Sequence, residues 1–246
     1  MVFNLETLPV QNDPILITGV GRRVGLHLAE TFIDRGIPVI GTYRSSYDSL
    51  RELSKKGVVL YQCDFNQQHQ INQLIDTITS DHDNLRAIIH NASEWIADGA
   101  ELPAAEIIQR MLQIHVSVPY QLNLAFEQLL MNCSHGHADI IHISDYVSSR
   151  GSRKHSAYAA SKAAMDNLTL SSSARLAPKV KVNSIAPALV LFNEHDDAEY
   201  REKTLKKSLM QREAGLAEFQ HAVDFLMDSQ YVTGRILPVD GGRHLV

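Results

Sequence analysis

The stretch that decides the fold is PILITGVGRRVG, residues 14–25. It joins a short apolar run typical of a buried strand, Pro14–Thr18, to a helical pattern over residues 22–35. Short apolar runs and longer amphipathic stretches alternate along the rest of the chain. Six later strands are expected at Pro38–Tyr43, Val58–Gln62, Ala87–His90, Asp139–Ser144, Val180–Ile185 and Arg235–Val239. Helical patterns fill the gaps at 67–81, 103–131, 156–177 and 216–229.

Strands that alternate with helices of this length predict right-handed βαβ units. The expected fold class is α/β, a single-domain Rossmann fold with a doubly wound seven-stranded parallel sheet and helices on both faces. The sequence has no internal repeat and no Pro/Gly/Ser-rich linker, so one domain is expected over residues 1–246. The charged segment 189–209 is expected to form a flap over the strand ends, although a solvated helix face fits its composition equally well.

Composition is that of an ordinary globular protein, with 44% hydrophobic and 21% charged residues. The net charge of −5 is spread out and no Lys/Arg run resembles a nucleic-acid tract, so no nucleic-acid partner is expected. The first ten residues, MVFNLETLPV, lack a secretory pattern, and no apolar run approaches the ~20 residues that cross a bilayer. Cys63 and Cys133 are far apart and suggest no disulfide framework. A cytoplasmic protein without membrane attachment is expected.

Three glycines shape the turn between the first strand and the first helix. Gly19 and Gly21 let the backbone turn tightly and approach a diphosphate, and Gly25 lets the helix pack on the strand. The helix N-terminus would present free N–H groups to the phosphates. The third glycine comes one residue later than in the usual dinucleotide fingerprint, where Val24 stands. Arg23 could contact the diphosphate or reach into a substrate pocket.

The end of the second strand indicates NADPH as the cofactor. NAD-specific enzymes usually place Asp or Glu there to bind the ribose 2′-hydroxyl. This sequence instead has Tyr43-Arg44-Ser45-Ser46, with no acid until Asp48. A carboxylate would repel a 2′-phosphate, whereas Arg44 can pair with it, aided by the two serine hydroxyls.

Tyr158 and Lys162, in YAASK, provide the strongest chemical signal. At positions i and i+4 they share one face of a helix. A free tyrosine has a pKa of about 10, and the Lys162 ammonium is expected to lower the pKa of Tyr158 and make it a usable acid.

Asp145 stands thirteen residues before Tyr158, with Ser144 beside it. A carboxylate there would repel the alkoxide that forms when a ketone is reduced. It suits reduction of a C=N bond, because the resulting nitrogen must collect a proton. A slip of one residue would bring Ser144 to the same place.

Together these motifs resemble the short-chain dehydrogenase/reductase superfamily and, within it, the pteridine reductases. The shared features are an arginine in the phosphate turn, an Asn-Ala-Ser segment followed by an aromatic residue (Asn91 to Trp95), and an Asp–Tyr–Lys set in place of Ser–Tyr–Lys. The resemblance extends to VTGRILPVDGG, residues 232–242.

The resemblance implies an NADPH-dependent oxidoreductase that transfers hydride to C6 of a 7,8-dihydropterin while N5 takes a proton. Dihydromonapterin is the first expected substrate and dihydrofolate the second. Asp145, Tyr158 and Lys162 would be catalytic, and Trp95 would stack on the pterin unless it is a core or interface tryptophan. The implied cofactor contacts are Gly19, Gly21, Arg22, Arg23, Val24, Tyr43, Arg44, Ser45, Asp64, Asn91, Ala92, Ser93, Tyr158, Lys162 and Pro187. The implied substrate contacts are Arg23, Ser93, Trp95, Asp145 and Tyr158.

Two other functions stay open: an NADPH-dependent carbonyl reductase of the 3-oxoacyl type, and a non-catalytic NADPH-binding regulator. His115 stands where the superfamily commonly has asparagine, and it would serve a proton relay or fill space. The family implies a homodimer or homotetramer formed through helices 103–131 and 156–177. No metal is expected, because Cys133, His135 and His137 offer too few ligands for structural zinc. The run Glu194–Asp197 also resembles a metal site but falls in the expected flap.

Overall fold

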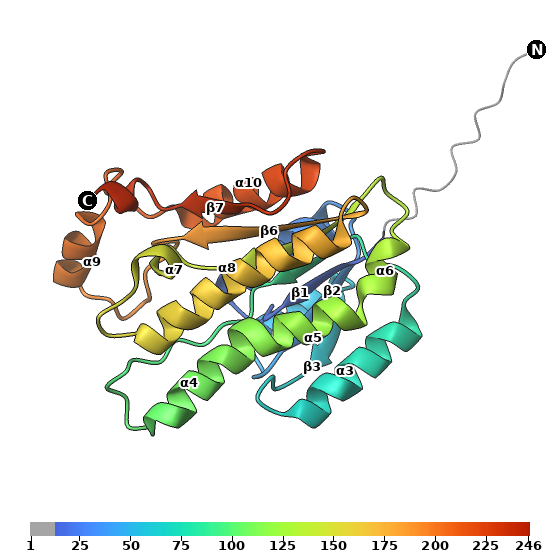
Figure 1. Cartoon of the computed structure of the whole chain (residues 1–246), viewed down its shortest axis with the longest axis horizontal. Coiled ribbons are helices and arrows are strands. Elements are labelled where there is room, and N and C mark those ends of the chain that lie inside the picture. The colour runs from blue at the N-terminus through green and yellow to red at the C-terminus, as the bar shows by residue number, and fades with distance from the viewer. Residues whose placement is uncertain (1–12) are drawn as a thin grey trace, which may run out of the picture.

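The structure is a computed structural model, and it describes residues 13–246, so the first ten residues considered above lie outside it. Seven parallel strands form one sheet in the order β3-β2-β1-β4-β5-β6-β7, which confirms the expected fold class (Figure 1). The strands are β1 (Ile15–Thr18), β2 (Val39–Tyr43), β3 (Val59–Gln62), β4 (Ala87–His90), β5 (Ala138–Ile143), β6 (Val180–Pro187) and β7 (Ile236–Val239). The strand order reverses between β1 and β4, and open α/β sheets bind ligands beyond the carboxyl ends of the strands at such a point.

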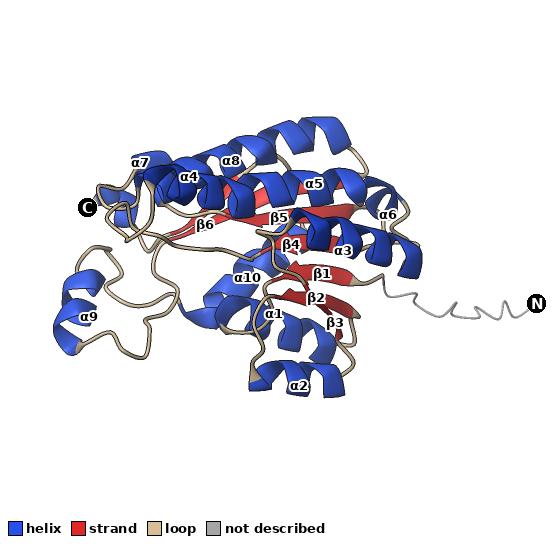
Figure 2. Cartoon of the chain, turned by 90° about the horizontal axis from the view of Figure 1, so that it is seen from below, coloured by secondary structure: helices blue, strands red, loops and turns tan. Residues whose placement is uncertain are grey.

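Helices cover both faces of the sheet, as Figure 2 shows. One face carries α1 (Arg23–Asp34), α2 (Asp48–Lys55) and α10 (Gly215–Asp228). The other carries α3 (Gln68–Asp81), α4 (Ala104–Leu112), α5 (Val118–Ala125), α6 (Glu127–Met131) and α8 (Ser156–Leu176). The central strands β1, β4 and β6 are buried along their whole length, as expected for parallel strands covered on two sides.

The helical pattern expected over 103–131 is confirmed, because helical elements follow one another from Ala104 to Met131 with only Phe126 outside them. Between α4 and α5 lies a π-helical turn, η1 (Gln113–Ser117), and α6 is separate from α5. Pro119 has no N–H to donate to the carbonyl four residues back, which belongs to His115. Wider turns of this kind often occur at functional sites.

Two short helices were not expected from the sequence. The helix α2 buries only Leu50 and Leu53, and two apolar residues in a polar stretch do not make a recognisable helical pattern in the sequence. The helix α7 (Val147–Arg150) follows the fifth strand. A 3₁₀ turn, η2 (Arg243–Leu245), lies near the C-terminus.

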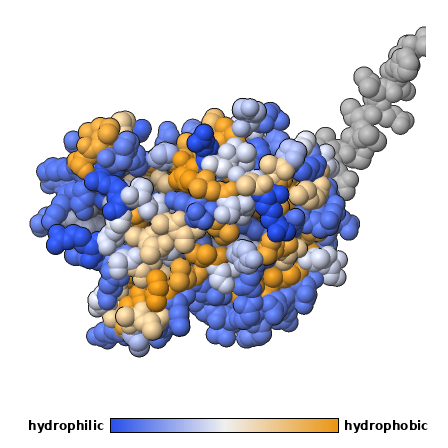
Figure 3. Space-filling model, in the orientation of Figure 1, coloured by the Kyte–Doolittle hydropathy of each residue, from blue (hydrophilic) through white to orange (hydrophobic). Residues whose placement is uncertain are grey.

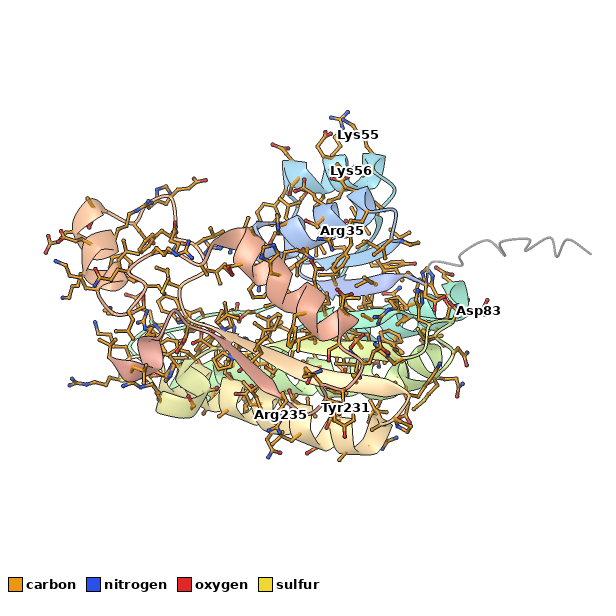
Figure 4. All side chains as sticks on the ribbon, turned by 90° about the horizontal axis from the view of Figure 1, so that it is seen from above. Arg35, Lys55, Lys56, Asp83, Tyr231 and Arg235 are labelled. Carbon is orange, nitrogen blue, oxygen red and sulfur yellow. The ribbon has the colours of Figure 1, made fainter. Side chains whose placement is uncertain are left out.

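The segment 189–209 contains an exposed helix, α9 (Ala198–Leu205), which stands apart from the sheet in Figures 1 and 2. The solvated helix that the composition allowed is therefore present within it. On the face that carries α1 and α10, Arg35, labelled in Figure 4, pairs with Asp224 of α10 at 2.8 Å. Among residues 13–246, no helix is long and apolar enough to span a membrane.

Candidate active site

The turn after β1 requires glycine at two positions. Gly19 has a φ of +76°, which favours glycine, and a Cβ there would lie 3.0 Å from the Ala92 Cα. A Cβ on Gly25 would lie 2.1 Å from the Gly19 carbonyl oxygen. The Asn91 amide donates to the carbonyls of Thr18 and Gly19, at 3.0 and 3.1 Å, and so joins the turn to the end of β4.

An open cleft of about 680 Å³ lies at this turn. It brings together most residues that the sequence assigned to the cofactor: Gly19, Gly21, Arg22, Arg23, Val24, Tyr43, Arg44, Ser45, Asp64, Asn91, Ala92 and Ser93. Trp95 also lines it. Pro187 lies apart from this set at the end of β6, where its carbonyl accepts a hydrogen bond from the Tyr146 N–H at 3.0 Å.

Arg44 lies at the edge of the cleft and pairs with Glu94 at 3.2 Å. Arg110 of α4 also donates to Glu94, through Nε at 3.0 Å. Burial alone would raise the pKa of Glu94, but the hydrogen bonds from Arg110 and Arg44 outweigh it and the pKa is lowered. The sequence analysis did not single out Glu94, because only the fold brings the two arginines to it.

The Tyr158 hydroxyl donates to Asp145 Oδ2 at 2.9 Å. Ser144 is buried, and among the described residues its hydroxyl has no hydrogen-bond partner. In this structure Asp145, and not its neighbour, therefore faces the tyrosine. Burial is the largest cause that raises the pKa of Asp145 above its usual range.

The expectation that Lys162 lowers the pKa of Tyr158 is wrong for this structure. Burial, followed by the charge of Asp145 and its hydrogen bond, raises the pKa of Tyr158 well above its usual value. The Lys162 ammonium lies 5.6 Å from the centre of the Tyr158 ring and donates to the Ile143 carbonyl at 2.6 Å. Burial lowers the pKa of Lys162 to about 8. Tyr158 is thus a protonated hydrogen-bond donor.

Ser93 connects the cleft to a buried histidine. Its hydroxyl lies 2.8 Å from His115 Nε2, and His115 Nδ1 lies 2.8 Å from the Ser161 hydroxyl. His115 belongs to η1 and is fully buried. Ser161, which the sequence analysis did not name, stands between the two residues of the Tyr158–Lys162 pair on α8.

Trp95 is 66% exposed, so the core alternative for this residue is wrong. Its ring stacks on His155, with ring centres 4.0 Å apart and an interplanar angle of 17°. An exposed indole at the edge of the cleft offers a flat face to a planar ligand.

Arg23 points away from the turn and holds the segment 189–209. Its guanidinium donates to the Leu191 carbonyl at 2.9 Å and to the Asn193 side chain at 2.8 Å. The Asn193 side chain also lines the cleft. The phosphate turn and this segment are therefore joined directly.

In the structure, the residues of the two sequence segments that resemble metal sites make other contacts than the sequence suggested. The structure brings Asp13, and not His137, to Cys133 and His135, with their ligand atoms within 4.8 Å of one another. The Asp13 carboxylate accepts hydrogen bonds from Ser134. In the segment 189–209, Asp197 caps α9 by accepting from the Tyr200 N–H.

The sequence profile of a family described as "Enoyl-(Acyl carrier protein) reductase" matches residues 19–244. With this fold, turn and Tyr–Lys pair, the chain belongs to the short-chain dehydrogenase/reductase family. A dihydromonapterin reductase of Escherichia coli strain CFT073 is 53% identical over 235 residues, which cover 96% of this chain and 98% of that one. A dihydromonapterin reductase of Shigella boydii is 53% identical over 232 residues, which cover 94% and 97%.

Solved structures agree with this family. The FolM alternative dihydrofolate reductase 1 from Brucella canis, complexed with NADP, has a TM-score of 0.84 and 26% identity, covering 96% of this chain and 95% of that one. The corresponding protein from Brucella suis, also in complex with NADP, has the same TM-score and identity and covers 96% of each chain.

Proposed function

We propose that this protein is an NADPH-dependent oxidoreductase that reduces a 7,8-dihydropterin to its tetrahydro form. Dihydromonapterin is the first candidate substrate and dihydrofolate the second, in line with the names of its relatives. The observation that carries the proposal is the contact between Tyr158 and Asp145, which places a carboxyl group where ketone reductases of this superfamily use a serine hydroxyl.

The cleft suits the dinucleotide. Gly19 and Gly25 allow the tight turn that brings the α1 N-terminus to a diphosphate, and a Cβ at either position would collide with the turn or with the end of β4. Arg44 would bind the 2′-phosphate, and Lys162 would bind the nicotinamide ribose. NADPH, when bound, supplies the hydride that C6 of the dihydropterin receives.

The chain's own residues deliver the proton that N5 takes. Tyr158 holds its proton at neutral pH and can pass it to N5, and the Asp145 carboxylate can then take up a proton from solvent water and return it to the tyrosine oxygen. Trp95 would leave His155 and stack on the pterin. Arg23 and Ser93 would contact the pterin from the turn and from the end of β4.

An assay panel tests the proposal. Purified protein is given NADPH or NADH with dihydromonapterin, dihydrofolate or an acetoacetyl thioester, and oxidation of the cofactor is followed. NADPH-dependent reduction of a dihydropterin is expected to be the fastest reaction. Faster reduction of the thioester would instead indicate a 3-oxoacyl reductase. Tight NADPH binding with no turnover of any substrate would indicate a regulator.

The proposal also covers the domain organisation and the location of the protein. The chain acts as one domain, with residues 189–209 as its substrate-covering flap, supported by the bonds from Arg23 to Leu191 and Asn193. It works in the cytoplasm, which fractionation of cells would test.

It also forms a homodimer or homotetramer through α4, α5 and α8. Figure 3 shows apolar surface on this face, and its exposed apolar residues are Leu112, Tyr120, Leu124 and Leu170. Light scattering on the wild type and on Leu124→Glu would test the assembly.

A further inference from the structure

Three side chains form a hydrogen-bonded series that runs from the cleft into the interior. Ser93 contacts His115 Nε2, and His115 Nδ1 contacts Ser161, both at 2.8 Å. His115 and Ser161 are 0% exposed. Ser93 itself is exposed to the cleft, but bulk water does not reach the contact between His115 and Ser161, so the hydrogen positions there follow from the partners alone.

Backbone carbonyls set the direction of the series. Ser161 has one hydroxyl hydrogen and donates it to the Tyr158 carbonyl oxygen at 2.7 Å. Its oxygen must therefore accept from His115 Nδ1, which requires a hydrogen on Nδ1. The Met111 carbonyl also bonds the His115 ring, and because a carbonyl can accept only from an N–H, one ring nitrogen carries a hydrogen.

The other ring nitrogen, Nε2, is then left to accept. Burial, followed by the charge of Lys162, lowers the pKa of His115 well below its usual value, so the ring is neutral and carries one N–H. Ser93 consequently donates its hydrogen to Nε2. The hydrogen bond between Ser93 and Tyr158 lowers the pKa of Tyr158, as a bond donated by Ser93 does. Ser93 has only one hydrogen, and an unprotonated imidazole nitrogen accepts it more strongly than a neutral phenol oxygen.

We propose that His115 is a positioning residue that acts through Ser93: it holds the Ser93 hydroxyl as a hydrogen-bond acceptor toward the cleft, so that the site selects a substrate with an N–H donor beside Tyr158. This inference rests on the dihydropterin function proposed above. A pterin ring carries N–H groups, whereas the reacting carbonyl of a 3-oxoacyl thioester carries none. Asp145 already accepts the single hydroxyl hydrogen of Tyr158, so the oxygen of Ser93 is free to accept from the substrate once His115 takes the serine hydrogen.

The tautomer can be tested without any substrate. Nitrogen-15 NMR of the histidine side chains in the full-length protein, with His115→Gln to assign the signal, should show a neutral ring with its hydrogen on Nδ1. Ser161→Ala removes an acceptor for that hydrogen and should shift the signal. A hydrogen on Nε2, or an imidazolium at neutral pH, would overturn the inference whatever the enzyme reduces.

A double-mutant cycle tests the route through Ser93. Ser93→Ala and His115→Phe should each lower kcat/KM for the dihydropterin by about 3- to 10-fold, the range for one hydrogen bond. The double variant should lose no more than Ser93→Ala alone, because the two residues act in series.

His115→Gln, whose amide oxygen can accept from Ser93, should recover most of the activity, and His115→Leu replaces the phenylalanine variant if that does not fold. Additive losses in the cycle, or unchanged kcat/KM when a side chain that cannot accept a hydrogen bond replaces His115, would contradict the inference. Failure of the wild type to reduce any dihydropterin would refute the proposed function, and the NMR result would still decide the tautomer.

Discussion

The Tyr158 hydroxyl and Asp145 Oδ2 lie 2.9 Å apart, with the hydroxyl as donor. A serine at the Asp145 position could donate a second hydrogen bond to a substrate oxygen, whereas an ionised carboxylate can only accept. The pair is therefore poorly suited to stabilise an alkoxide. It is well suited to a reaction in which a nitrogen must gain a proton.

Substitutions in this pair should separate the two kinds of reduction. Tyr158→Phe removes the proton donor and should lower kcat for the dihydropterin by about 10²- to 10⁴-fold. Asp145→Ser should also lower dihydropterin reduction, while reduction of an acetoacetyl thioester rises, because the serine can donate to the alkoxide. Steady-state kinetics on both substrates measure the change. Full dihydropterin activity in Asp145→Ser would mean that this carboxyl group has no part in proton delivery.

Arg44 should decide the preference for NADPH. Arg44→Ala removes a charge-assisted bond to the 2′-phosphate and should raise KM for NADPH by about 10- to 100-fold, with little change for NADH. Arg35→Ala is the matched control, because it removes an arginine paired with a different carboxylate, that of Asp224. Equal effects of Arg44→Ala on the two cofactors would place the 2′-phosphate elsewhere.

Trp95 is the single tryptophan of the chain, so intrinsic fluorescence reports on it alone. It now stacks on His155 at 4.0 Å, and a bound pterin should replace that ring. We expect dihydropterin to quench the emission in the presence of NADPH. Trp95→Ala should raise KM for the dihydropterin without changing KM for NADPH. If His155→Ala abolishes the quenching of Trp95 emission by dihydropterin but leaves KM for the dihydropterin unchanged, then the stacking of Trp95 on His155, and not contact with the pterin, determines the emission.

The pH dependence should reflect Lys162. Burial lowers its pKa to about 8, so the ammonium that would bind the ribose is present below that pH and lost above it. Because kcat/KM reports the free enzyme, kcat/KM for NADPH should fall as the pH rises through about 8. Arginine keeps its charge at high pH, so in Lys162→Arg the fall of kcat/KM for NADPH should move to a higher pH or disappear. An identical decline in that variant would assign the titration to another group.

Gly25 should be intolerant of even one methyl group. A Cβ at this position would lie 2.1 Å from the Gly19 carbonyl oxygen and 2.5 Å from the Asn91 amide. Gly25→Ala should therefore weaken NADPH binding and lower the melting temperature, because the turn must open to make room. A Cβ on Gly99 would meet nothing within 4 Å, so Gly99→Ala is the control. Wild-type affinity for NADPH in Gly25→Ala would show that the turn can shift without loss.

Most of the architecture could be predicted from sequence because its signals are local. The seven strands are short apolar runs, and hydrophobic burial in a parallel sheet demands such runs wherever they fall in the fold. The turn at Gly19 and Gly25 and the spacing of Tyr158 and Lys162 are likewise properties of neighbouring residues. The helical stretch 103–131 was predictable from its pattern, whereas the wider π-helical turn at Gln113–Ser117 within it was not.

The contacts that specify the chemistry arise between residues distant in sequence. The choice between Asp145 and Ser144 depended on which side chain the end of β5 turns toward α8, and the fold turned Asp145 to Tyr158. Likewise, burial raised the pKa of Tyr158 where spacing alone predicted a decrease. Residue types and their spacing determined the family, the sheet and the presence of an Asp–Tyr–Lys set. Only the tertiary structure decided hydrogen-bond direction and protonation, because both depend on burial and on partners that the chain brings together from afar.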